Sequence, residues 1–240
     1  MIENNFDRPP QKTDCQMNLS IKNFLIVISL AFIFQFVSGF LVAILTKGNS
    51  SAFLETSTGT LIMSVVNNFC YLLAIFLVYG FKNSITDFFA VKKKAIRVGV
   101  IWGLIALTMN FVVSLASNMW YQANDMSPAK QNIVQVLENF DGPYMLLTIG
   151  LTSLLIPVFE EILYRGVLQR TLQQRYSVRT GLIISSLLFA VMHFDWYQLP
   201  GLFVIGMCFG IAYNKTNSLL SPIIAHMVNN IFALALLFYV

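Results

Sequence analysis

The residues of this sequence best suited to chemistry are a few ionisable side chains inside long apolar runs. Glu160 and Glu161 interrupt one such run, and the two histidines of the chain, His193 and His226, fall in two later runs. An ionisable group at bilayer depth is costly, so it marks a functional site by default and needs a partner. Carboxylates and imidazoles transfer protons near neutral pH or bind a metal that activates water. We therefore expect proton-transfer or metal-assisted chemistry in a poorly hydrated site.

Helical spacing sorts these side chains into pairs. Residues four apart share one face of a helix, so Glu161 can pair with Arg165, whereas Glu160 points elsewhere and is left for chemistry. The same spacing places His226 and Asn230 on one face, where they can offer two hydrogen-bond donors to one small target.

The chain has seven apolar segments that could carry these side chains, and about 20 apolar residues suffice to cross a bilayer. Only 11% of the 240 residues are charged and 57% are hydrophobic. Such a composition has too few polar residues to cover the surface of a soluble globular protein of this size. We expect an all-α bundle of about seven transmembrane helices, with these segments as spans: Phe24–Leu45, Leu61–Phe81, Val98–Ala116, Tyr144–Leu168, Gly181–His193, Leu199–Tyr213 and Leu219–Val240. Counting about 1.5 Å per residue from the basic boundaries puts Glu160, His193 and His226 at similar depths.

Basic residues predict the orientation of these spans. With the N-terminus inside, 13 of the 15 Lys and Arg residues fall on the inner side, and only Lys47 and Lys130 on the outer side. Cytoplasmic loops carry such a positive excess, so we expect a cytoplasmic N-terminus in a multi-pass protein of the cell membrane. The same bias explains the net charge of +4 and argues against nucleic acid as a partner.

No repeat or long polar linker divides the apolar part of the chain. We expect a cytoplasmic polar tail over residues 1–23 and a single membrane domain over residues 24–240. Gly206 and Gly210, spaced as G-x-x-x-G, predict a close approach of two helix backbones.

Three short patterns resemble a known family, the CAAX-prenyl-endopeptidase and bacteriocin-processing (CPBP) intramembrane proteases. The family pattern is E-E-x-x-x-R, then F-x-x-x-H, then H-x-x-x-N. The corresponding residues here are, in order, Glu160, Glu161 and Arg165, then Phe189 and His193, then His226 and Asn230. The resemblance covers about residues 144–240, and the first 140 residues carry no motif.

The resemblance implies a peptidase and a role for each matched residue. Glu160 would be the general base that activates water, assisted by His193, while His226 and Asn230 would hold the oxyanion. Glu161 and Arg165 would be a supporting pair. A poorly hydrated carboxylate is a stronger base, and donors aimed at an oxyanion each contribute a few kcal/mol, about 3 to 4. The implied substrate is a membrane-associated protein or peptide, and the lipid bilayer is the other partner.

Three alternatives remain open from the residues alone. Glu160, His193 and His226 could bind Zn²⁺ with water as fourth ligand, although no H-E-x-x-H is present and we expect no cofactor. A bacteriocin self-immunity protein would act by binding without catalysis. A proton-coupled transporter also keeps Glu and His in its spans, but repeated halves are not evident.

Overall fold

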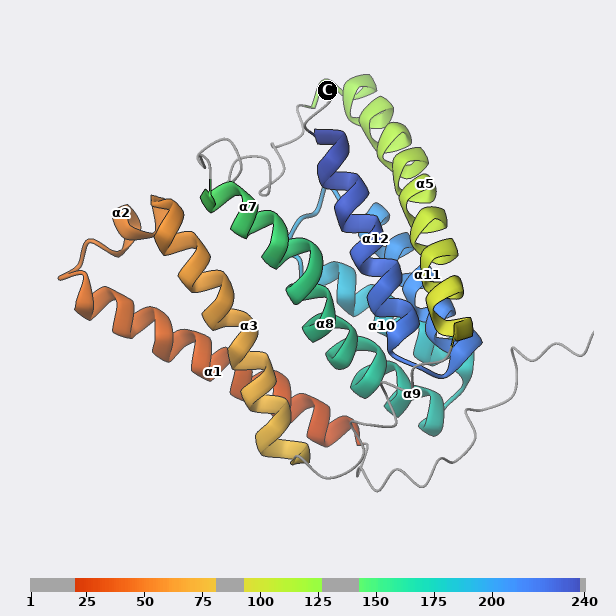
Figure 1. The fold of residues 1–240 in the computed structure, drawn as a ribbon, viewed down its shortest axis with the longest axis horizontal. Coiled ribbons are helices and arrows are strands. Elements are labelled where there is room, and N and C mark those ends of the chain that lie inside the picture. Colours follow the sequence, from red (N-terminus) through yellow and green to blue (C-terminus); the bar gives the residue numbers. More distant parts are fainter. Residues whose placement is uncertain (1–19, 81–92, 127–142, 238–240) are drawn as a thin grey trace, which may run out of the picture.

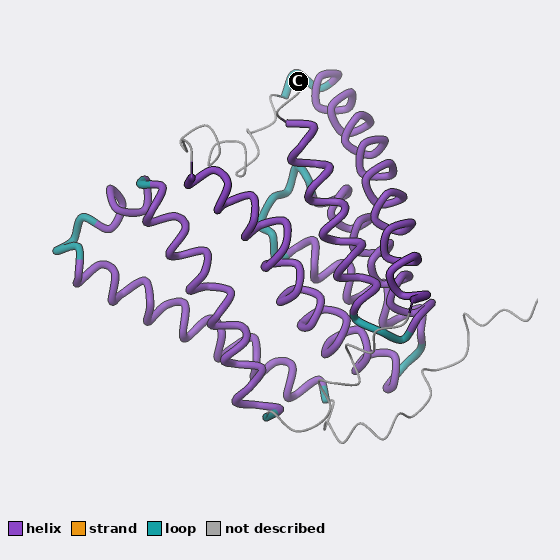
Figure 2. The backbone as a smooth tube through the Cα atoms, viewed as in Figure 1, coloured by secondary structure: helices purple, strands orange, loops and turns teal. Residues whose placement is uncertain are grey.

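The computed structural model describes residues 20–80, 93–126 and 143–237, and all regular structure in these ranges is helical (Figure 1, Figure 2). The expected all-α class is therefore confirmed. Most of the expected tail over residues 1–23 lies outside the described residues, as do residues 81–92, 127–142 and 238–240.

Within the described residues, each of the seven apolar segments overlaps most of its length with a helix or with a continuous helical run. The fourth segment is a single run of α-helical and π-helical pieces, where a π-helix closes its backbone bonds over five residues instead of four. In chain order the elements are α1 (Ile21–Leu45), α2 (Ser50–Glu55), α3 (Ser57–Tyr79), α5 (Lys93–Ala123), α7 (Pro143–Gly150), the π-helix η1 (Leu151–Leu155), α8 (Ile156–Glu161), the π-helix η2 (Ile162–Gln169), α9 (Arg170–Arg175), α10 (Val178–Val191), α11 (Leu199–Thr216) and α12 (Leu220–Leu237).

Three helices of the described part are long and apolar enough to cross a membrane, by length and composition: Ile21–Leu45, Leu61–Tyr79 and Lys93–Ala123. Val178–Val191 and Leu220–Ala235 are apolar but shorter. The count of seven spans and the cytoplasmic N-terminus therefore stay predictions. Arg165 and Arg170 are buried inside the protein, so they do not count as loop charges in the charge argument.

Polar side chains cap the N-termini of α1, α3 and α10, and residues that tolerate positive φ end α3 and α11. Ser20 accepts a hydrogen bond from the Asn23 amide at 3.0 Å, and Thr56 and Ser177 cap α3 and α10 in the same way. Gly80 ends α3 with φ 70°, and Asn217 ends α11 with φ 49°.

Glycines set how closely the C-terminal helices pack. A Cβ on Gly206 would lie 3.2 Å from the Ser186 backbone of α10, and one on Gly210 would lie 2.7 Å from Gln169 Oε1. The close approach predicted from this G-x-x-x-G pair is thus confirmed. A second pair with the same spacing, Gly99 and Gly103 in α5, packs against α12 and was not singled out from the sequence.

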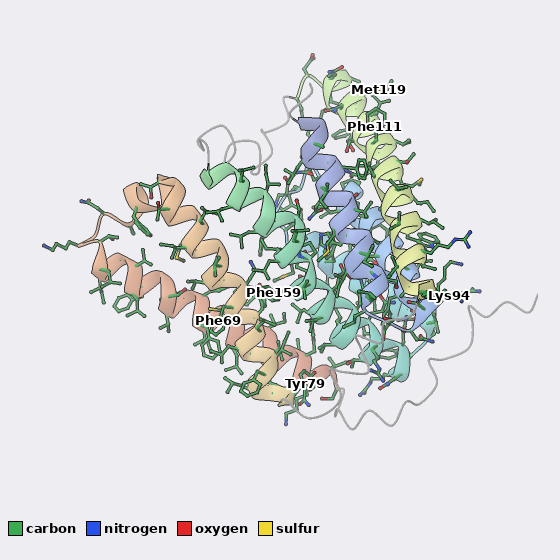
Figure 3. The ribbon with its side chains drawn as sticks, in the orientation of Figure 1. Phe69, Tyr79, Lys94, Phe111, Met119 and Phe159 are labelled. Carbon is green, nitrogen blue, oxygen red and sulfur yellow. The ribbon has the colours of Figure 1, made fainter. Side chains whose placement is uncertain are left out.

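The helices fall into two groups (Figure 1). The α1–α3 pair lies on one side, and α5, α10, α11 and α12 pack together on the other, with the run from α7 to α9 between them. Large apolar side chains cover the outer surface of both groups, among them Phe69 on α3 and Phe111 and Met119 on α5 (Figure 3). Such a surface fits a surrounding of lipid, not water.

Candidate active site

Glu160 and Glu161 lie in α8, a six-residue α-helix between the π-helices η1 and η2. Pro157 in α8 has no N–H, and the N–H of Ile156 bonds to Leu151 O, five residues back. Thr152 O therefore has no donor in either Ile156 or Pro157. π-Helical turns are rare and occur frequently at functional sites.

Glu161 is the centre of a buried ion-pair cluster, which we define as Glu160, Glu161, Arg165 and His226. Arg165 Nε lies 2.9 Å from Glu161 Oε2, and both side chains are fully buried. The pairing predicted from their spacing is confirmed. The other carboxylate oxygen, Oε1, lies 3.1 Å from His226 Nδ1 on α12, a contact that the spacing does not reveal.

Glu160 faces the same imidazole from the other side. Its Oε2 atom lies 3.7 Å from His226 Nε2, and its side chain is 24% exposed whereas that of His226 is 6% exposed. His226 thus lies between two carboxylates, one buried and one partly accessible. With a proton on each nitrogen of His226, the four groups of the cluster sum to zero formal charge, which lowers the cost of burying them together.

Aromatic rings enclose His226. The Phe209 ring stacks on the imidazole with centroids 4.6 Å apart and planes at 27°, and Phe189 meets it edge-on at 5.8 Å. The Tyr164 ring also meets Phe189 edge-on, with centroids 5.3 Å apart, and the Arg165 guanidinium lies 5.3 Å from the Phe189 ring centre. Phe209 was not identified from the sequence, because it lies on α11, which carries none of the three family patterns.

His193 lies just beyond the end of α10, not inside a helix as the apolar run suggested. The helix ends at Val191, and the N–H of His193 bonds to Ala190 O, so the Phe189 carbonyl has lost its usual helical donor. His193 Nδ1 lies 2.6 Å from that carbonyl oxygen, and the two rings pack at 4.6 Å. Because a carbonyl only accepts, Nδ1 carries the proton and Nε2 is the acceptor in a neutral ring.

Asn230 contacts the Thr152 carbonyl of η1, to which neither Ile156 nor Pro157 donates. Its Nδ2 donates to Thr152 O of η1 at 3.0 Å, and its Oδ1 accepts from Asn229 Nδ2 at 3.2 Å. This bond uses one of the two N–H donors of the side-chain amide. The structure therefore brings Glu160 and His226 together directly, joins His193 to them through Phe189, and holds Asn230 against η1.

A chain of polar side chains, buried except for the half-buried Asn214, leads away from the cluster, and we call it the amide chain. Its members are Ser185, Gln169, Asn214 and Gln173, which successively contact one another between η2, α9, α10 and α11. Arg165 Nη1 lies 3.5 Å from Ser185 Oγ at its near end. These residues were not predicted from the sequence, because Gln169, Gln173 and Asn214 stand near the ends of apolar runs, where polar residues are ordinarily solvated.

The cluster does not fit the zinc site that was left open. Among the described residues, no group of three or more His, Cys, Asp and Glu side chains could hold a metal ion. Glu160 and His226 are in contact, whereas His193 reaches them through Phe189, whose ring packs on both imidazoles.

Comparison with known proteins identifies the same part of the chain. Residues 142–232 match the family model described as Type II CAAX prenyl endopeptidase Rce1-like. The resemblance to this protease family is thus confirmed for the segment that holds all the candidate site residues.

Three similar proteins were found, two of which are described as a peptidase or a protease. The chain is 28% identical to an uncharacterized 24.3 kDa protein of Escherichia coli over 77% of its own length and 81% of that protein. It is 22% identical to the putative membrane peptidase YdiL of Bacillus subtilis and 29% identical to the membrane-embedded CAAX protease MroQ of Staphylococcus aureus. These two matches cover 59% and 54% of this chain, and 57% and 54% of those proteins. No solved structure matches the chain. The comparisons support a membrane protease.

Proposed function

We propose that this chain is an intramembrane endopeptidase that hydrolyses peptide bonds of a membrane-associated protein or peptide, in a multi-pass protein of the cell membrane. The observation that carries the proposal is the contact between Glu160 Oε2 and His226 Nε2, made across two helices inside the segment that matches the protease family.

Glu160 is the base in this proposal. It is the accessible carboxylate of the cluster, whereas Glu161 is fully buried with both oxygens engaged. Glu160 removes a proton from water as the oxygen attacks the scissile carbonyl, and the same proton then goes to the leaving amine when the C–N bond breaks. His193 assists, because its neutral ring presents Nε2 as an acceptor while Nδ1 is held by the Phe189 carbonyl.

His226 and Asn230 stabilise the negative oxygen of the tetrahedral intermediate in this proposal. Glu161 holds His226 Nδ1, as a carboxylate orients an imidazole in other hydrolases, and this leaves Nε2 directed to the reacting groups. Asn230 contributes the amide N–H that Thr152 O does not use. Each such donor is worth about 10²- to 10³-fold in rate.

Replacement of Glu160 by Gln tests the proposal. The variant keeps the shape of the side chain and should lower cleavage by roughly 10²- to 10⁴-fold, because the amide cannot take the proton. It should also hold uncleaved substrate, which can be captured from membranes and identified by mass spectrometry. Asp125→Asn is the control, since it makes the same chemical change at an exposed position outside the helices, and it should cleave normally.

Two results would contradict the proposal. If Glu160→Gln retains the full cellular effect of the protein, that effect does not depend on cleavage, and a bacteriocin self-immunity role through binding is favoured. If dialysis against a strong chelator abolishes activity and Zn²⁺ restores it, the water is activated by metal. Activity that persists with far less than one metal ion per chain agrees with Glu160 as the base.

A further inference from the structure

Gln169 lies at the centre of the amide chain and was not among the residues that the family pattern covers. Its side chain is fully buried, and it makes three polar contacts. Nε2 donates to Gly210 O at 3.2 Å and to Asn214 Oδ1 at 3.0 Å, and Oε1 lies 3.3 Å from Ser185 Oγ. A buried polar group with this many partners holds one orientation.

The direction of these bonds is fixed by Gly210. A backbone carbonyl only accepts, so the amide nitrogen of Gln169 must face Gly210 and its amide oxygen must face Ser185. There is room for this because Gly210 has no side chain: a Cβ there would lie 2.7 Å from Gln169 Oε1. Ser185 then has two carbonyl acceptors, Gln169 Oε1 and Leu182 O at 3.2 Å, and its hydroxyl proton goes to one of them.

Ser185 is thereby left with a lone pair for Arg165. The Arg165 guanidinium is held at two points, by Ser185 Oγ on Nη1 and by Glu161 Oε2 on Nε. Holding Oε2 in this way leaves Oε1 of Glu161 for His226 Nδ1 at 3.1 Å. An unbroken series of directional contacts therefore runs from Gln169 to the imidazole.

We infer that Gln169 is a positioning residue for His226, acting through Ser185, Arg165 and Glu161. The inference rests on the proposed function for its catalytic consequence, although the coupling itself concerns only the resting protein. Loss of the Gln169 amide lets Ser185 and Arg165 reorient, and Glu161 then no longer holds Nδ1 of His226 at one place.

Gln173 offers a matched control. It lies four residues after Gln169 on the same helical face, it is 3% exposed, and it donates to the same Asn214 oxygen at 2.9 Å. Its other bond goes to Val178 O, away from Ser185. Gln169→Met and Gln173→Met thus remove amides of equal size and similar burial. Only Gln169→Met breaks the series of contacts that leads through Ser185 to His226.

The first readout is spectroscopic and needs no substrate. The chain has two histidines, so protein labelled with ¹⁵N-histidine gives two imidazole signal pairs, which His193→Gln assigns. Gln169→Met should move the His226 Nδ1 and Nε2 signals, and Gln173→Met should leave them in place. Ser185→Ala, a smaller change that breaks the same series, should reproduce the shift even if Gln169→Met does not fold.

The second readout is turnover of the peptide trapped by Glu160→Gln. Gln169→Met and Ser185→Ala should each lower kcat about tenfold with KM unchanged, and the double variant should be no worse than either single one, because both break one series. Gln173→Met should keep kcat. Unmoved His226 signals in folded Gln169→Met and Ser185→Ala, or an equal shift in Gln173→Met, would overturn the inference. Absence of cleavage in the unmodified protein would instead remove the proposed function and leave the coupling intact.

Discussion

Two parts of the molecule are both built from apolar helices, yet their buried surfaces differ. In the α1–α3 pair, the buried side chains are small or apolar, namely Phe24, Val27, Ala31, Cys70, Ala74 and Ile75. In the part formed by α8, η2 and α9 to α12, the buried residues include the polar Glu161, Arg165, Gln169, Ser185, His226 and Asn229. Apolar contacts can be exchanged with lipid, whereas a buried charge needs its specific partner. We expect substitutions to have large effects in the second part and small ones in the first.

Arg165→Ala should have the largest effect on stability. It leaves the fully buried Glu161 carboxylate without its cation, and breaking a buried ion pair by removing one partner costs about 3–5 kcal/mol. Membrane-inserted protein and its resistance to thermal unfolding in detergent should both fall sharply. The double variant Glu161→Gln/Arg165→Met, which removes both charges, should recover most of the stability. Normal abundance of Arg165→Ala would mean that the carboxylate finds another partner.

Gly103→Ala should come next, because it tests whether α5 belongs with the catalytic helices. A Cβ on Gly103 would lie 2.7 Å from Ala225 O, next to His226 on α12. Overpacking of this kind costs about 1–3 kcal/mol, and the displacement of α12 should also lower turnover. Gly39→Ala in α1 is the matched control, because nothing lies within 4 Å of its added Cβ. Equal stability and turnover of the two variants would contradict the division drawn above.

Two Phe→Leu variants should show the smallest effects and the clearest contrast. Phe209 is fully buried and stacks on His226, so Phe209→Leu should cost about 1 kcal/mol and reduce turnover. Phe36 on α1 is 78% exposed, and Phe36→Leu should change stability by less than about 0.5 kcal/mol. The measurement is unfolding in a fixed detergent with the cleavage assay alongside. A larger loss from Phe36→Leu would reveal a partner on the α1 face.

Local spacing accounts for what could be predicted from the sequence. Glu161 and Arg165 are four residues apart on one helical run, so their pairing follows from helical periodicity. The contact between Glu160 and His226 agrees with their similar estimated depths. The helical class followed from the length of the apolar runs.

Contacts that depend on irregular backbone could not be predicted in this way. The Asn230 side chain donates to Thr152 O in the π-helical segment η1, where Ile156 bonds to Leu151 O and Pro157 has no N–H. α10 ends at Val191, two residues earlier than the apolar run implied, and the His193 ring contacts the Phe189 carbonyl released there. The amide chain was not predicted for another reason. Its members lie on different helices, and the spacing of residues within one helix does not say how two helices are rotated relative to each other.

The π-helical segment η1 also has a consequence for insertions and deletions. A π turn contains one residue more than the α turn it replaces, so a relative with one residue fewer between Gly150 and Ile156 could form a continuous α-helix. The Glu160–Glu161 pair would keep its place, while α7 would turn by about 100° around its own axis. Such a relative should therefore show a one-residue gap here, accompanied by an apolar pattern over residues 143–150 that is shifted by one position.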